Sequence, residues 1–336
     1  MSMTSGTLIG VERTRRPARL SLAELSEQAR EASRTWAPLD LSTPVDTSRH
    51  FLCPTVTPLY YTEIHRSLTV EEKLRYNQLS GLAFNEVISF FEEMMAPVLL
   101  PAAARAARSS PELAECLARF EEEERRHLTT WRELNRWTEA ELHGGKDRRF
   151  LKLPALLKAV FRDLCRRPRM FPMLFWLLAA QEELSMEVAR RSLAMPGDLI
   201  EPRFAQAYRA HLADEVRHVQ IDWHLIDHFH APAGRVCRGL NAFLFREAFR
   251  HFFVTPKRLA RRVVEALARD FPNLAPLVPE MLLELRGLRT CRPYQEMMYS
   301  RRNHPVLFAL FDSFPEMQGI RKVLAGYEPR PKGGFE

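Results

Sequence analysis

One stretch of the chain places ionisable side chains where a helix should bury apolar ones. Between residues 202 and 229, seven side chains recur at alternating steps of four and three, which puts them on one side of an α-helix. They are Phe204, Tyr208, His211, Glu215, His218, Asp222 and Leu225. The stripe begins and ends with apolar residues, so we expect it to face the interior, where unpaired ionisable groups are costly. A bound metal ion is the simplest compensation.

A second predicted helix, over residues 111–143, repeats this anomaly. Glu124 and His127 lie three residues apart in the middle of its apolar stripe, as Glu215 and His218 do in the helix just described. A carboxylate and an imidazole at this spacing can bind one ion from the same helix face. Two such helices are typical of carboxylate-bridged dimetal sites in four-helix bundles.

Two further helices offer carboxylates at a similar height. In the helix predicted over 69–95, Glu86 shares a face with several apolar residues. In the helix predicted over 172–193, Glu182 and Glu183 follow a long apolar segment, and spacing alone does not choose between them. Taken singly, an inward glutamate or histidine is more often a paired core residue than a ligand. The joint pattern on four helices favours a dimetal site.

The rest of the sequence predicts an all-α protein. Thr69 followed by Glu72 is a helix-capping box, long helical patterns end at prolines or glycines, and no segment sustains β-strand alternation. We therefore expect a ferritin-like four-helix bundle elaborated with additional N- and C-terminal helices. The expected organisation is an arm with a short helix over 1–60, a ferritin-like domain over 61–325 with its core at 70–230, and a flexible tail over 326–336.

Composition excludes several other classes of protein. The net charge is +7, but the arginines are dispersed and interleaved with acidic residues, so no nucleic-acid partner is expected. The longest apolar run, over 171–180, is about half of a membrane span. The 5 cysteines have no C-x-x-C spacing, which argues against a zinc ribbon or a disulfide framework. The expectation is a cytoplasmic protein with no membrane partner.

The string around Glu215 adds two details. Asp214 and Arg217 lie off the metal-facing stripe, where they can hydrogen-bond the ligating imidazoles; the alternative is a simple exposed ion pair. His211 lies one turn before Glu215 on the stripe itself. The site therefore has three histidines, where an ordinary dimetal carboxylate site has two.

These motifs resemble a known family. Phe84-Asn85-Glu86, Glu124-x-x-His127 and His211-Leu-x-Asp214-Glu215-x-x-His218 are similar to the p-aminobenzoate N-oxygenase family of non-haem diiron oxygenases. The resemblance covers roughly residues 70–230. It implies a ferritin-like bundle, two iron ions, O2 as co-substrate, a homodimer, and oxidation of a small aryl amine to hydroxylamine, nitroso or nitro products.

The resemblance also implies a ligand set. Carried over residue by residue, it consists of Glu86, Glu124, His127, Glu183, His211, Glu215 and His218. Glu124 and Glu215 would bridge the metals, and no catalytic side chain beyond the ligands is implied. Glu182 competes with Glu183 for the position on the third helix and would otherwise support the ligands from beside them.

Iron suits this mixture of carboxylates and imidazoles, although manganese suits it as well. No G-x-G-x-x-G motif for a flavin or nicotinamide occurs, so we expect an external electron donor. Two alternatives stay open at this point. One is a diiron hydroxylase or desaturase that acts on carbon, and the other is a non-catalytic ferritin-like iron-binding protein.

Overall fold

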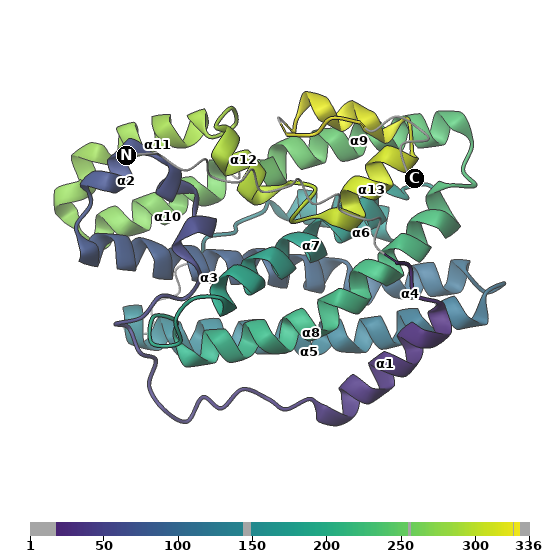
Figure 1. Ribbon diagram of the computed structural model, residues 1–336, viewed down its shortest axis with the longest axis horizontal. Coiled ribbons are helices and arrows are strands. Elements are labelled where there is room, and N and C mark those ends of the chain that lie inside the picture. Colours follow the sequence, from purple (N-terminus) through teal and green to yellow (C-terminus); the bar gives the residue numbers. More distant parts are fainter. Residues whose placement is uncertain (1–17, 144–148, 255–256, 325, 330–336) are drawn as a thin grey trace, which may run out of the picture.

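Four long helices form the centre of the molecule (Figure 1). In this computed structural model, which describes residues 18–143, 149–254, 257–324 and 326–329, they are α3 (Val70–Met94), α5 (Pro111–His143), α7 (Met173–Leu193) and α8 (Pro202–Leu225). Helix α7 packs along α8, α3 packs along α5, and α5 and α8 close the bundle. The described residues hold no β-strand, only an isolated bridge between His50 and Ile200. The all-α, ferritin-like prediction is confirmed.

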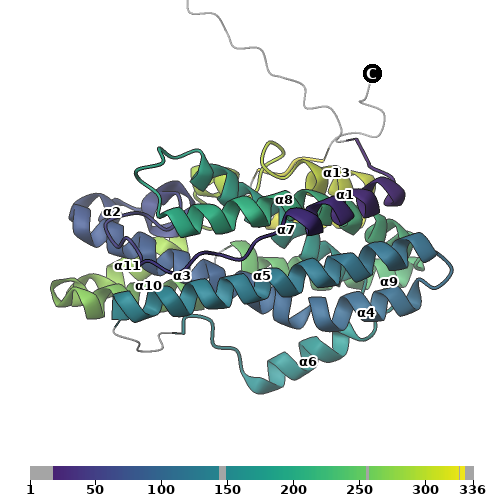
Figure 2. The same ribbon diagram turned by 90° about the horizontal axis from the view of Figure 1, so that it is seen from below.

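Shorter helices surround this bundle. Helices α9 to α13 form a layer on one side of it, and α1 lies against α5 and α8 on the other (Figures 1 and 2). Their bounds are α1 Leu22–Thr35, α2 Glu63–Ser67, α4 Ala96–Ala106, α6 Ala155–Cys165, α9 Arg235–Phe249, α10 Lys257–Asp270, α11 Val278–Gly287, α12 Arg292–Met298 and α13 Pro305–Ser313. Residues 1–17 of the expected N-terminal arm and residues 330–336 of the expected tail lie outside the described residues.

The ends of the bundle helices follow local sequence signals. At the start of α3, the Thr69 side chain accepts from the Glu72 amide, and the Glu72 carboxylate accepts from the Thr69 amide, so the predicted capping box is confirmed. Helix α3 ends at Met94 as expected. The chain does not leave the helical path there, because Pro97 lies in the first turn of α4, where a missing N–H costs nothing.

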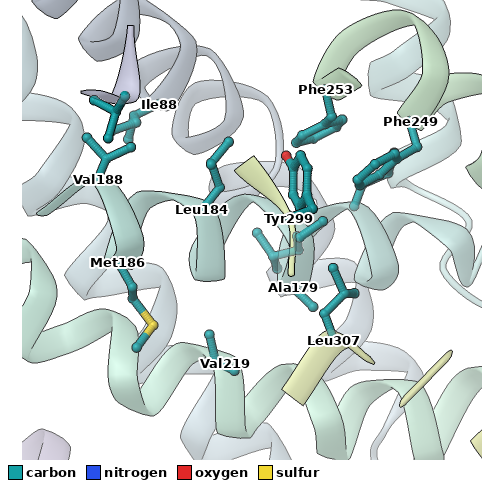
Figure 3. Close-up of a cluster of buried hydrophobic side chains, with 14 of the residues drawn as sticks. Ile88, Ala179, Leu184, Met186, Val188, Val219, Phe249, Phe253, Tyr299 and Leu307 are labelled. Carbon is teal, nitrogen blue, oxygen red and sulfur yellow. The ribbon is translucent and has the colours of Figure 1, made fainter. Parts of the chain in front are cut away.

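Helix α7 is buried on nearly every side. All residues from Met173 to Ala189 are buried. Figure 3 shows Met186 and Val219 approaching each other between α7 and α8, while Phe249, Phe253 and Tyr299 gather beside Ala179. The Phe249 and Tyr299 rings are 4.7 Å apart. The C-terminal layer therefore covers the side of α7 that would face solvent in a bare four-helix bundle.

The stretch Val70–Ala106, which comprises α3 and α4, is long and apolar enough to span a membrane by length and composition alone. Half of its most apolar window is buried inside the protein. This stretch packs against α5 and carries buried polar side chains such as Asn85 and Glu92. This burial and packing are typical of helices in a protein core.

Gly81 marks a close approach between α3 and the segment before it. A Cβ atom at this position would lie 2.7 Å from Phe51 Cβ. The Phe51 ring is itself fixed, because it stacks on Phe204 of α8 at 4.2 Å. Only glycine at position 81 allows α3 to lie this close to the stacked rings of Phe51 and Phe204.

We expect Gly81→Ala to lower the free energy of unfolding by about 1–3 kcal/mol, since Phe51 cannot move away without breaking its stack. Gly239→Ala is the matched control: it lies within α9, has nothing within 4 Å of the added Cβ, and should stabilise by about 0.5–1 kcal/mol. Denaturant unfolding of both variants checks this. Equal effects would contradict the close packing at Gly81.

Candidate metal centre

Six buried side chains from three helices meet in the middle of the bundle. They form two overlapping groups whose ligand-type atoms lie within 4.8 Å of one another in each group. The first group is Glu124, His127, Glu215 and His218; the second is Glu92, His127 and His211. All six are at most 5% exposed. His127 belongs to both groups, so the two form one continuous centre.

The nitrogen atoms converge on Glu215. Its Oε1 lies 2.9 Å from His211 Nε2, 3.5 Å from His127 Nδ1 and 3.5 Å from His218 Nδ1. Even so, both Glu215 oxygens and His218 Nδ1 are buried without a hydrogen-bond partner among the described residues. Ligands about 2.1 Å from one metal ion and at right angles are about 3 Å apart and do not hydrogen-bond each other. The spacing fits a shared cation.

Electrostatics supports the same interpretation. Burial alone would lower the pKa of His127, but hydrogen bonds with Asp214 and Glu124 raise it to about 10. Burial would also raise the pKa of Glu124, yet the neighbouring imidazoles of His127 and His218, each 3.2 Å from its Oε1, lower it to about 2. Protons on His127 and His218, whose pKa values are both raised, thus offset the charge of the buried carboxylates before a cation binds. Divalent ions, which need neutral imidazoles and charged carboxylates, would displace those protons.

Two outer carboxylates fix the imidazole rings. His127 Nε2 lies 2.9 Å from Asp214 Oδ2, and His218 Nε2 lies 2.8 Å from Glu123 Oε2. These contacts leave each Nδ1 facing the centre, which is the usual way a carboxylate orients a metal-bound histidine. Arg217 Nη2 donates to both carboxylates, at 2.6 Å to Glu123 and also to Asp214. The alternative of an exposed ion pair does not apply, because Asp214 and Arg217 are each 6% exposed.

The local sequence explains why α5 and α8 deliver these groups. Helix α8 starts with Pro202 in its first turn, and the Glu201 carboxylate accepts from the amides of Arg203 and Phe204. From there the stripe carries His211, Glu215 and His218 inward. Rings of α5 pack against these imidazoles: Phe120 stacks on His218 at 3.9 Å, and Trp131 meets His211 edge-on at 5.1 Å.

Helix α3 contributes Glu92, which the sequence analysis did not single out. Its Oε1 accepts from Trp131 Nε1 and lies 3.6 Å from His211 Nε2. The structure does not bring Glu86 into either group: its carboxylate accepts from the amides of Phe150 and Leu151. The stripe of α3 that faces α5 runs through Asn85, which hydrogen-bonds Asn135, and not through Glu86.

The structure does not bring the glutamates of α7 into these two groups either. The Glu183 carboxylate accepts from the amides of Val306 and Leu307, in the first turn of α13. Burial raises its pKa to about 8. Burial raises the pKa of Asp222, one turn beyond His218, and the charge of Glu183 is among those that raise it further. Glu182 is also buried, at 4% exposure.

Two residues of the centre were missed from the sequence, and for different reasons. Glu92 lies three residues before the Met95 break and outside the apolar stripe that pointed to Glu86. Glu123 directly precedes Glu124, as Asp214 precedes Glu215. That repeated acidic pair was the available signal, since an acidic residue before each E-x-x-H glutamate can reach the imidazole of the other helix.

Comparison with known proteins identifies one family. The family model of p-aminobenzoate N-oxygenase AurF matches residues 17–270 of the chain, well over half of its length. No curated protein matches the chain.

The choice between Glu92 and Glu86 can be tested directly. Glu92→Ala should lower the ferrous iron bound per chain, because it removes the only carboxylate that α3 contributes to the two groups. Glu86→Ala should keep the iron and lower Tm, since the amides of Phe150 and Leu151 lose their acceptor. Iron analysis and thermal unfolding of both variants decide. Iron loss confined to Glu86→Ala would contradict the geometry.

Arg217 gives a second prediction. Arg217→Ala leaves Glu123 and Asp214 buried without their shared cation, so both imidazoles lose their fixed orientation. We expect about 10–100-fold weaker binding of Co²⁺, followed by visible absorbance against a chelator. Arg209→Ala, an exposed change on the same helix, is the control. Equal affinities in the two variants would show that the outer contacts do not support the metal.

Proposed function

The chain belongs to the p-aminobenzoate N-oxygenase family of diiron enzymes, and from this premise we propose that it oxidises the nitrogen of a small aryl amine. The products would be the hydroxylamine, nitroso or nitro compound. The observation that carries the proposal is the buried group of three carboxylates and three imidazoles around Glu215, whose two oxygens have no hydrogen-bond partner among the described residues.

We propose that six residues hold the metals: Glu92, Glu124, His127, His211, Glu215 and His218. Glu124 and Glu215 lie between imidazoles of α5 and α8, which suits bridging carboxylates. This set takes Glu92 in place of Glu86. The bound irons would supply activation of O2, the chemistry for which this mixed ligand set is suited.

For the seventh ligand we propose Glu183 of α7, as the family resemblance implies. Its charge contributes to raising the pKa of Asp222, which lies one turn beyond His218 on α8. To reach a metal it would exchange the amides of Val306 and Leu307 for the ion. Glu182 is the alternative, and as a neighbour of Glu183 it would support the ligands by packing.

The protein's own groups prepare the centre in two ways. Asp214 and Glu123 accept from the Nε2–H groups of His127 and His218, which leaves both Nδ1 atoms facing the centre, where they would bind the metals once the metals displace their protons. The rings of Phe120 and Trp131 exclude water from the imidazole side. A dry surround strengthens the interactions between the ligands and the metals.

The remaining expectations stay part of the proposal. They are an external electron donor, a cytoplasmic location, a homodimer, and one catalytic domain over 61–325 preceded by an N-terminal segment over 1–60. The dispersed charge gives no reason to add a nucleic-acid partner.

The test is turnover by the iron-loaded protein. With a chemical reductant and ¹⁸O2, p-aminobenzoate and aniline should yield labelled hydroxylamine or nitro products by mass spectrometry. 4-Methylbenzoate, which offers carbon in place of the amine, should not be oxidised. His127→Ala should lose the products, and His251→Ala, an exposed change outside the centre, should keep them.

Two results would overturn the proposal. Oxidation confined to 4-methylbenzoate or a fatty acid would make the protein a hydroxylase or desaturase. Iron uptake far above two ions per chain without product would make it an iron-storage protein.

A further inference from the structure

Asp222 belongs to the metal-facing stripe of α8 but to neither of the two metal groups. It follows His218 by four residues, so the two side chains lie on the same face of the helix. It is 0% exposed, and neither of its carboxyl oxygens has a hydrogen-bond partner among the described residues. A buried carboxyl without a donor is costly in a protein interior, so this group needs a partner from outside the described chain.

Metal binding would not supply that partner. The two oxygens of Glu215 and the Nδ1 atom of His218, which are also buried without a hydrogen-bond partner, belong to a group that can hold a cation. The ligand atoms of each group lie within 4.8 Å of one another, and Asp222 is in neither group. Once the cations are bound, the Asp222 carboxyl is therefore still a buried acceptor without a donor among the described residues.

The charges around Asp222 favour a ligand that donates hydrogen bonds. Burial raises the pKa of Asp222 well above its usual value, and the opposing charge of His218 does not cancel this effect. Three further carboxylates raise it as well: Glu215, Glu124 and Glu183. Even a protonated carboxyl keeps a carbonyl oxygen that accepts from an N–H group. Negative surroundings attract such a donor and repel a group that only accepts.

The helix surface next to Asp222 is apolar. Val219 and Leu225 lie three residues before and after it, which makes them its neighbours on the helix, and both are buried. Val219 also approaches Met186 of α7 (Figure 3). A single polar group among apolar side chains is typical of a site that fixes the orientation of a small organic ligand.

We propose that Asp222 binds the amino group of the substrate, accepting a hydrogen bond from one N–H of an aryl amine and so placing the nitrogen beside the centre. The inference rests on the proposed function and deepens it, because it names the side chain that recognises nitrogen. No bond is made or broken in this contact. Aryl amines are uncharged near neutral pH, so the group recognised is a hydrogen-bond donor and not an ammonium ion.

The same contact selects against substrates that offer carbon. A methyl group in place of the amine cannot donate, and it would leave the Asp222 carboxyl buried without a partner. Sites that hydrogen-bond an N–H of the substrate reject analogues that lack it far more strongly than sites that distinguish ligands by shape alone. Asp222 thus gives a physical reason for oxidation of nitrogen that is independent of family membership.

The experiment compares p-aminobenzoate with 4-methylbenzoate as ligands of the Co²⁺-loaded protein, under nitrogen, so that calorimetry measures binding without turnover. The wild-type protein should prefer the amine at least about tenfold. Asp222→Leu replaces the carboxyl by an apolar group of similar shape, and it should lose this preference by weakening the binding of the amine alone. Asp222→Asn keeps a carbonyl acceptor and should retain most of the preference.

Metal content and Tm separate this role from a structural one. Asp222→Leu should bind as much Co²⁺ as the wild-type protein, because Asp222 belongs to neither group. It should raise Tm by about 2 °C or more, because it removes a buried carboxyl that has no donor among the described residues. Asp227→Leu is the matched control, since Asp227 pairs with Arg19 and is partly exposed. This variant should keep the preference for the amine and should not raise Tm.

Four results would overturn the inference. They are a wild-type protein without preference for the amine, an unchanged preference in Asp222→Leu, loss of Co²⁺ from that variant, and a lower Tm of that variant. The second would mean that Asp222 holds a water molecule only, the third that it is a metal ligand, and the fourth that its role is structural. Failure of the proposed function would look different: the iron-loaded protein would form no labelled product, while the preference of the Co²⁺-loaded protein for the amine could still be measured.

Discussion

The centre depends on the hydrogen bonds from Arg217 to Glu123 and Asp214. One nitrogen of its guanidinium binds both Glu123 and Asp214, and each of these carboxylates holds the outer nitrogen of one imidazole. Buried carboxylates without a cation would be strongly destabilising, and imidazoles without acceptors could turn. The arginine removes both problems at once. It also joins α5 to α8, so packing of the bundle and orientation of the ligands come from the same contacts.

The C-terminal layer determines how α7 contributes. Because that layer covers the outer side of α7, the helix has no solvent-facing side between Met173 and Ala189. The Glu183 carboxylate consequently accepts hydrogen bonds from the backbone amides in the first turn of α13, which belongs to that layer. This contact joins α7 to the first turn of α13. A bare four-helix bundle would leave the same residue without these amide donors.

How well the sequence predicts the inward-facing residues of a helix depends on how many of its sides are buried. In α5 and α8 the stripe at steps of three and four that the sequence shows is the one that carries the ionisable residues of the centre, and five of the seven expected ligands lie in the two groups. Helix α3 is buried on two sides, because α5 and α10 both pack on it. The apolar stripe that contains Leu79 and Leu82 could therefore not reveal which side faces the centre. Glu92 was missed for that reason.

The sequence by itself determined the all-α class, the bounds of the long helices, and the two E-x-x-H pairs, because capping signals and helical periodicity depend only on neighbours along the chain. The tertiary structure decided what depends on other segments: that α3 turns Glu92 toward His211, that Glu86 serves the Phe150 and Leu151 amides, and that Glu183 meets α13. A carboxylate is drawn to the nearest donor or cation. Which one is nearest is fixed only when the helices have packed.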